Sequence, residues 1–149
     1  MSAQNNRNRK MQDLIGNEKL GRFQEKTAVF LYDFAVLGGA TGAKTLTDAD
    51  GNAATLPDNA LVSKLAIDVV TPLTSGNSAT VALGVATDGA ANFKAAADFD
   101  HASYVAATQV PFLPAVGKKL TGSRAVLATI ANALTAGKFY LYVSYYEGF

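Results

Sequence analysis

The clearest pattern in the chain is an alternation of apolar and polar residues through residues 61–87. Its apolar positions recur at every second residue in two runs: Leu65, Ile67 and Val69 in the first, and Ala79, Val81, Leu83 and Val85 in the second. A period of two is typical of a strand with one buried face, so each run is predicted to be a strand. The link at residues 71–77 is rich in the turn-forming residues Pro, Ser, Gly and Asn. We therefore expect the two strands to pair with each other as an antiparallel hairpin.

Shorter stretches on both sides of this pair also have the composition of strands. They are residues 27–36, 44–46, 54–56, 92–96, 124–132 and 138–146. About eight short strands, separated by turn signals such as Asp50-Gly51, predict an all-β fold: an antiparallel two-sheet sandwich, jelly-roll-like. Residues 88–98 also fit a helix capped by Asp88, although their neighbours favour a strand. Residues 110–123 contain Pro111 and Pro114 and are expected to form a long irregular loop, which is often functional.

The last predicted strand is apolar on both faces. Phe139, Leu141, Val143 and Tyr145 alternate with a second set that includes Tyr140, Tyr142 and Tyr146. A two-faced strand is buried on both sides or touches a neighbouring molecule. We predict that the second set belongs to a subunit interface. A platform that stacks on carbohydrate is an alternative, whereas a platform for single-stranded nucleic acid would need a basic groove that is not evident.

Residues 1–25 differ from the rest of the chain and are expected to form an N-terminal arm, with the sandwich domain at residues 26–149. The arm begins with the unopposed cations Arg7, Arg9 and Lys10, and its apolar residues are Leu14, Ile15, Leu20 and Phe23. A frayed tail with one amphipathic turn explains this pattern. An extended arm that orders only on a neighbouring subunit explains it too, and these residues would then contact that subunit. A tail that binds nucleic acid is a weaker alternative, because three charges give little phosphate affinity.

Composition limits the classes of function. The 149 residues suit one domain, and only 17% of them are charged, so part of the surface is expected to be covered by other copies. The net charge of +1 provides no field that attracts nucleic acid. The absence of Cys excludes disulfides and thiolate metal sites. No signal peptide or apolar run of about 18 residues is visible, so the sequence predicts a soluble protein made in a cytoplasm.

Three motifs resemble chemical sites, and a simpler interpretation is favoured for each. Residues 38–45, GGATGAKT, depart from a phosphate-binding loop because Ala43 stands where Gly is needed before the Lys. Residues 48–52, DADGN, have Asn59 where a calcium loop needs its bidentate Glu, so a hairpin turn is preferred. His101 is the only histidine, and no G-x-S-x-G elbow presents a serine to it. We predict no catalytic, cofactor-binding or metal-binding residue, and no enzymatic activity.

Two segments resemble a class of small virion structural proteins of tailed bacteriophages. They are LPDNALVSKLAIDVVTPLTSGNSATVALGVATD at residues 56–88 and LTAGKFYLYVSYY at residues 134–146. The shared features are the Leu-Pro entry with Ala60, the alternating strand and its Ser/Gly turn, the strand that starts at Ala79-Thr80, and the terminal aromatic strand. The similarity spans residues 53–146 and leaves the arm outside it.

The resemblance implies a non-enzymatic virion protein of the capsid surface, made in the host cytoplasm. Some members of the class are capsid decoration (cement) proteins, often trimers. A homotrimer that binds the major capsid protein on the outside of the head is therefore expected, with no membrane partner and no nucleic acid. The arm would connect neighbouring capsid subunits. The alternative is a head-fibre or tail adhesin whose residues 110–123 and exposed tyrosines bind a host glycan or receptor.

Overall fold

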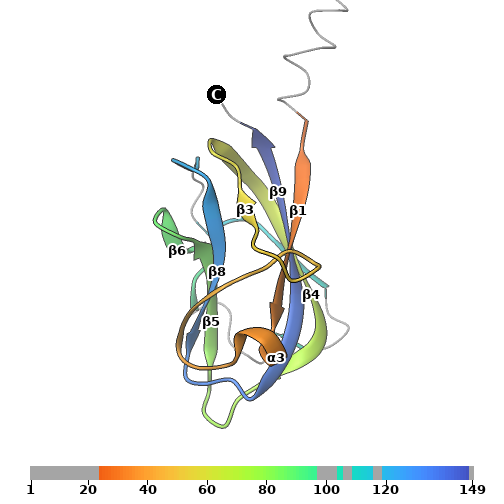
Figure 1. Cartoon of the computed structure of the whole chain (residues 1–149), viewed down its shortest axis with the longest axis vertical. Coiled ribbons are helices and arrows are strands. Elements are labelled where there is room, and N and C mark those ends of the chain that lie inside the picture. The colour runs from red at the N-terminus through yellow and green to blue at the C-terminus, as the bar shows by residue number, and fades with distance from the viewer. Residues whose placement is uncertain (1–23, 97–103, 106–108, 116–118, 148–149) are drawn as a thin grey trace, which may run out of the picture.

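The computed structural model describes residues 24–96, 104–105, 109–115 and 119–147, which form two antiparallel sheets packed face to face (Figure 1). One sheet has the order β1-β9-β4-β7: β1 (Lys26–Asp33), β9 (Ala136–Glu147), β4 (Ala60–Thr74) and β7 (Gln109–Phe112). The other has the order β2-β8-β5-β6: β2 (Gly42–Thr45), β8 (Arg124–Ala131), β5 (Thr80–Val85) and β6 (Gly89–Lys94); β3 (Thr55–Leu56) also pairs with β8. The predicted all-β, jelly-roll-like sandwich is therefore confirmed, with nine strands among the described residues.

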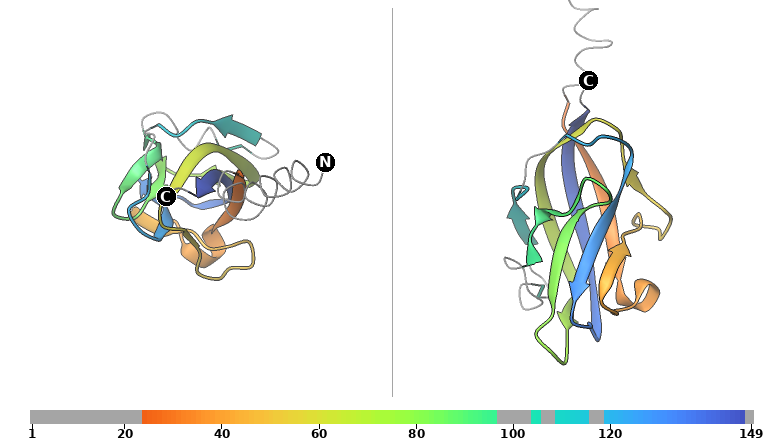
Figure 2. Two further views of the ribbon diagram at one scale, coloured as in Figure 1. Left: turned by 90° about the horizontal axis from the view of Figure 1, so that it is seen from above. Right: turned by 90° about the vertical axis from the view of Figure 1, so that its left-hand side faces the viewer.

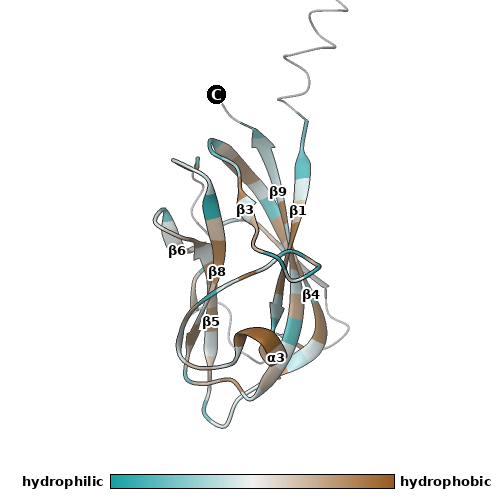
Figure 3. Cartoon of the chain, viewed as in Figure 1, coloured by the Kyte–Doolittle hydropathy of each residue, from teal (hydrophilic) through white to brown (hydrophobic). Residues whose placement is uncertain are grey.

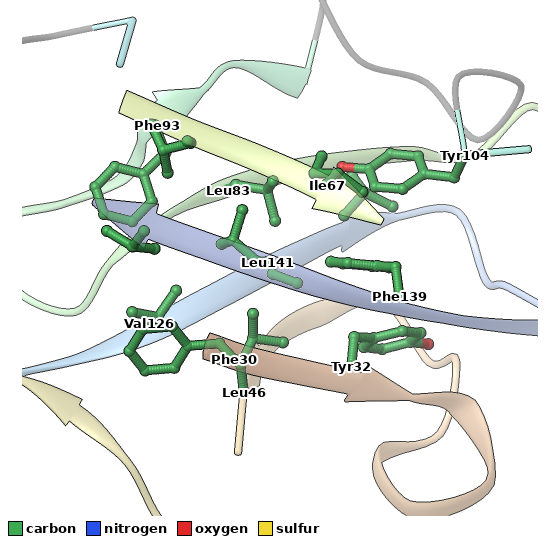
Figure 4. Packing of buried hydrophobic residues seen from close by; sticks show 14 of the residues in the cluster. Phe30, Tyr32, Leu46, Ile67, Leu83, Phe93, Tyr104, Val126, Phe139 and Leu141 are labelled. Atoms are coloured by element: carbon green, nitrogen blue, oxygen red, sulfur yellow. The ribbon is translucent and has the colours of Figure 1, made fainter. Parts of the chain in front are cut away.

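The core lies between the sheets and is built from the predicted alternation. Leu65, Ile67 and Val69 are at most 2% exposed, as are Val81 and Leu83 in the facing sheet. The view from above in Figure 2 shows the two layers, and hydrophobic and hydrophilic bands alternate along the strands in Figure 3. Aromatic rings fill one part of the core, where Figure 4 shows Tyr32, Phe139 and Tyr104 together. The prediction of which residues face inward is confirmed.

The hairpin predicted over residues 61–87 is wrong. β4 pairs with β9 and β7, whereas β5 pairs with β8 and β6, so the two strands lie in different sheets. The residues between them carry the chain across the space between packed sheets, which is about 10 Å. Alternation requires only that each strand bury one face, and it does not select the strand's partner. Across the sandwich the two apolar faces contact each other directly, and this is the arrangement that the chain adopts.

Two boundaries also differ from the expectations. β1 ends at Asp33, not at residue 36, because the Asp33 Oδ1 accepts a hydrogen bond from the Ala35 amide and caps the helical turn α3 (Phe34–Leu37). The expected loop at residues 110–123 starts as strand β7, in which Pro111 lies opposite Ala66. Proline lacks an N–H donor, and β7 is an edge strand, where a missing donor is tolerated.

The segment after β5 is a strand and not a helix. β6 covers Gly89–Lys94 and pairs with β5, with a register shift between Leu83 and Val85. The shift brings the two backbones very close at Gly84, where a Cβ atom would lie 2.3 Å from the Gly89 carbonyl oxygen. Only glycine fits there, because any other residue would collide with backbone atoms that cannot rotate away. The helical alternative for residues 88–98 is thus wrong over its described part.

Both ends of the described chain lie at the same end of the sandwich (Figure 1). Lys26, the first residue of β1, is paired with Tyr145 near the end of β9. The Lys26 Nζ also lies 2.8 Å from the Glu147 Oε1. The described chain therefore begins at the edge of the four-stranded sheet, beside the last described residues of β9.

Candidate functional site

The side of the four-stranded sheet that faces away from the core is called the outer face. It carries the tyrosines of β9 that the sequence predicts to lie at a subunit interface. On β9 the residues Phe139, Leu141 and Val143 are fully buried, so Tyr140, Tyr142 and Tyr146 point to the opposite side. The strand register places Tyr142 between Val29 of β1 and Ala66 of β4, and Tyr140 between Leu31 and Asp68. The structure thus brings the three tyrosines onto one surface with aliphatic neighbours from β1 and β4.

Large apolar side chains are exposed along this face. Leu61 and Tyr146 are directly opposite each other on β4 and β9, and they are 43% and 37% exposed. Leu113, just after β7, is 73% exposed. Single exposed apolar residues are normal, whereas Leu61 and Tyr146 form an exposed apolar pair on neighbouring strands.

A groove of about 520 Å³ crosses the outer face over β4. Its shape follows from the register, because Ala66 is a small residue between Tyr142 on one side and Pro111 on the other. The residues that line it come from β4, β7 and β9 and from the position just after β7: Lys64, Leu65, Ala66, Pro111, Phe112, Leu113, Tyr142 and Ser144. The sequence alone does not reveal the groove, because one of its walls belongs to β7, and the prolines of residues 110–123 predict a loop there.

The chain enters the domain next to this groove. The Glu25 carboxylate accepts a hydrogen bond from the Ser63 hydroxyl at 2.9 Å and lies 2.9 Å from the Lys64 Nζ. The bond from Lys64, followed by that from Ser63, lowers the pKa of Glu25 from its ordinary value. Both partners are on β4, so Glu25 reaches from the start of β1 across β9. The other predicted interface residues lie outside the described residues: Arg7, Arg9, Lys10, Leu14, Ile15, Leu20 and Phe23.

Residues 48–52 form a tight turn, as predicted, although the strands before and after it, β2 and β3, both pair with β8 and not with each other. The Asp48 Oδ1 accepts hydrogen bonds from the Asp50 and Asn52 amides at 2.9 and 2.8 Å, and Thr47 pairs with Ala53 across the turn. These amide bonds, that from Asn52 first, lower the pKa of Asp48. The carboxylate is therefore used to hold the turn.

Other candidate chemistry is equally limited in the part of the chain that the structure describes. Residues 38–45 run from the end of α3 into strand β2, so the motif lacks the helix that a phosphate loop needs. His101 lies outside the described residues. Within those residues, no three His, Asp or Glu side chains gather into a metal site, and no helix is long and apolar enough to span a membrane.

A polar cluster around Asp88 holds two loops together. Its carboxylate accepts hydrogen bonds from the Thr121 amide and hydroxyl and from the Arg124 Nε, at 3.1, 2.7 and 2.8 Å. The Asp88 side chain is only 5% exposed. The cluster ties the β5–β6 turn to the segment before β8, and every group has a partner, so its role is structural. The sequence suggested Asp88 only as a helix cap, because the partner residues are more than thirty positions away.

Replacing Asp88 with asparagine is expected to lower the midpoint of thermal unfolding by roughly 5 °C or more, because an amide cannot accept from all three donors. The pKa of the Asp88 carboxyl in the folded protein is well below its ordinary value. The hydrogen bond from Arg124 is the largest cause, and the bonds from Thr121 come next. Stability that depends on this charge is therefore complete above the pKa of an unfolded Asp, about 3.9, and is lost as the pH falls below it. The difference in midpoint between the two proteins should narrow from pH 7 to pH 3. Asp50→Asn, on an exposed turn, is the matched control, and an equal loss there would contradict the expectation.

Comparison with solved structures finds the same fold in chains of phage capsids. A chain of the cyanophage Pam1 capsid asymmetric unit matches with a TM-score of 0.58 and 22% identity, over 83% of this chain and 84% of that one. A chain of the acidic stable capsid of Helicobacter pylori bacteriophage KHP30 matches with 0.53 and 22%, over 82% and 86%. A chain of the Ralstonia phage GP4 capsid matches with 0.57 and 16%, over 85% and 86%. No family model matches the chain, and no curated protein sequence is significantly similar.

Proposed function

We propose that the chain is a non-enzymatic structural component of a phage virion, and specifically a decoration (cement) protein bound to the outside of the head. The observation that carries the proposal is the fold that the chain shares with chains of three phage capsids, over more than four fifths of its length. The resemblance of residues 53–146 to small virion proteins points the same way, and it rests on sequence motifs and not on the fold. The two similarities therefore support each other.

Surface features favour a decoration protein over a major capsid subunit. Leu61 and Tyr146 are exposed side by side on one sheet face, and Glu25, at the start of the domain, contacts Ser63 on the same strand as Leu61. In the proposal the N-terminal segment, residues 1–23, lies along the shell and contacts several copies of the major capsid protein. Each contact is weak, but a second contact made by a tethered segment is intramolecular, so the affinities multiply. The residues proposed to make these contacts are Arg7, Arg9, Lys10, Leu14, Ile15, Leu20 and Phe23.

An adhesin of a head fibre or tail is a second candidate, and one observation favours it. The half-buried Tyr142 forms a wall of the groove over β4, and an aromatic ring beside a groove is suited to stacking on a sugar. Binding of the purified protein to a glycan array, abolished by Tyr142→Ala, would support this candidate. Antibody labelling of the tail instead of the head would support it too.

Electron microscopy of particles made with and without the chain tests the decoration role. A phage that encodes the chain is expected to assemble complete heads when its gene is deleted, because a decoration protein is added to a finished shell. Those heads should lack a surface density of this size and should release DNA at lower temperature than wild-type heads. Failure to form any head would identify a major capsid subunit and would overturn the proposal. If heads made with and without the chain showed the same surface density, the chain would belong to another part of the virion and the proposed decoration role would be wrong.

A further inference from the structure

The groove over β4 opens close to the point where the described chain begins. Lys64, one of the residues that line the groove, lies 2.9 Å from the Glu25 carboxylate. The described chain starts at Gln24, directly before Glu25. This contact holds the start of the domain beside one end of the groove, so the residues that precede Gln24 are tethered within a short distance of it.

The charges around the groove leave one carboxylate without a cation. Glu25 balances Lys64 at the near end. Asp68 lies two residues beyond Ala66 on β4 and points to the same outer face. It is half-buried, and no ion pair to it is found among the described residues. The far end of the groove is therefore suited to a segment that carries positive charge.

We propose that residues 19–23 of the N-terminal segment bind in the groove of their own chain. These residues, KLGRF, contain two cations, two large apolar side chains and no acid. In the bound state Leu20 lies over Ala66, and Phe23 lies at the near end, beside Lys64 and Ser144. The groove, of about 520 Å³, is within the range of ligand sites, roughly 300–1,000 Å³.

The tether is long enough for this placement. The strand register sets Ala66 level with Val29, two strands away, and Val29 follows Glu25 by four residues. With strands about 4.8 Å apart and a rise of about 3.3 Å per residue, Ala66 lies roughly 16 Å from Glu25. Five extended residues span about that distance. Leu20, five residues before Glu25, therefore reaches the centre of the groove.

The spacing within the segment also fits an extended ligand. A polyproline II helix has three residues per turn, so Leu20 and Phe23 share one side of it, and Lys19 and Arg22 share the next. Grooves lined by aromatic side chains, as this one is, bind extended segments of this kind. With Leu20 over the centre, Lys19 is one residue closer to Asp68 and within reach of its carboxylate.

This inference concerns the free protein and does not depend on the proposed place in a virion. If the decoration role holds, the shell and the groove compete for Leu20 and Phe23, and a capsid subunit must displace the segment from its own domain. The core side chains of β4 are buried by the facing sheet and not by the groove. Docking is therefore expected to add little to the thermal stability of the domain.

Two introduced cysteines measure the docking, because the natural chain has none. Gly21→Cys lies in the segment, and Leu113→Cys lies in the groove lining, where Leu113 is 73% exposed. In a glutathione buffer, the fraction of chains with the internal disulfide gives the effective concentration of the two thiols. We expect this concentration to fall at least tenfold when Leu20 and Phe23 are changed to serine, since the tether keeps its length and loses only its apolar contacts. An unchanged value, or disulfides mainly between two chains, would overturn the inference.

A substitution in the groove tests the site with the segment left intact. Ala66→Arg fills the groove and is expected to lower the effective concentration at least tenfold. Ala43→Arg, on the outer side of the other sheet opposite Thr129, is the matched control and should leave it unchanged. Equal values for these two variants would show that the segment does not bind in the groove.

A double-mutant cycle tests the register of the segment. Asp68→Asn and Lys19→Gln should each lower the effective concentration by roughly two- to fivefold, the range of a partly exposed ion pair. The double variant should lose no more than either single variant, because both remove the same contact. If its loss is the product of the two single losses, Lys19 does not pair with Asp68 and the proposed register is wrong.

Discussion

Replacing Phe139 with alanine is expected to lower the free energy of unfolding by about 3–5 kcal/mol. The Phe139 side chain is fully buried, and its ring centroid lies 5.3 Å from that of Tyr32 and 5.0 Å from that of Tyr104 (Figure 4). The variant loses the transfer energy of the ring and leaves a cavity between two side chains that cannot collapse into it. A domain of this size is stable by about 5–15 kcal/mol, so the loss is a large fraction of the total. Urea unfolding, followed by circular dichroism, measures it.

The neighbouring residue on the same strand provides the control. Tyr140 points to the outer face, so Tyr140→Ala removes an aromatic ring from the same strand without opening a cavity in the core. Its cost is expected to stay below about 1 kcal/mol. Both variants should be measured at a concentration where the chain is monomeric, so that self-association does not add to the result. Equal losses for the two variants would contradict the assignment of their faces.

The contrast between these two residues shows what the sequence determines. A period of two identifies the strands and the buried side of each, which is why the core positions of β4, β5, β8 and β9 could be predicted. The partner of each strand leaves no such mark, because hydrogen bonds between strands are made by the backbone and are nearly independent of side chains. For this reason the predicted pairing of the two strands in residues 61–87 was wrong. The capping bond from Ala35 to Asp33 likewise converted the end of a predicted strand into a helical turn.

The candidate site could also be predicted from the sequence only in part. The outward tyrosines could be identified because β9 is apolar on both faces. Such a strand has apolar surface to bury on the outer face as well as in the core. The groove could not be identified, because it needs Pro111 of β7 opposite Ala66 of β4, two residues 45 positions apart. Proline signalled a loop, although an edge strand tolerates it. Contacts between such distant residues, including those of Asp88, depend on the fold as a whole.

The largest expected effect on function comes from removing residues 1–23. The shortened chain should unfold at nearly the same temperature as the full chain but should no longer bind to phage heads. Its stability is retained because Gln24 and Glu25 remain, so the contacts of Glu25 with Ser63 and Lys64 are preserved. A deletion that extends through residue 25 would also remove these contacts. A loss of binding could then result from lower stability of the domain. Co-sedimentation of the purified protein with heads that lack it measures attachment, and thermal scans measure folding.

Two substituted full-length chains separate the contributions within the segment. Arg7, Arg9 and Lys10 changed to glutamine should weaken attachment mainly at low salt, because exposed charges are screened as salt increases. The set of four serine substitutions at residues 14, 15, 20 and 23 should weaken it at every salt concentration, since the lost contacts are apolar. If the shortened chain binds heads as well as the full chain does, the segment has no part in attachment. The outer face or the loops of the sandwich would then have to bind the shell.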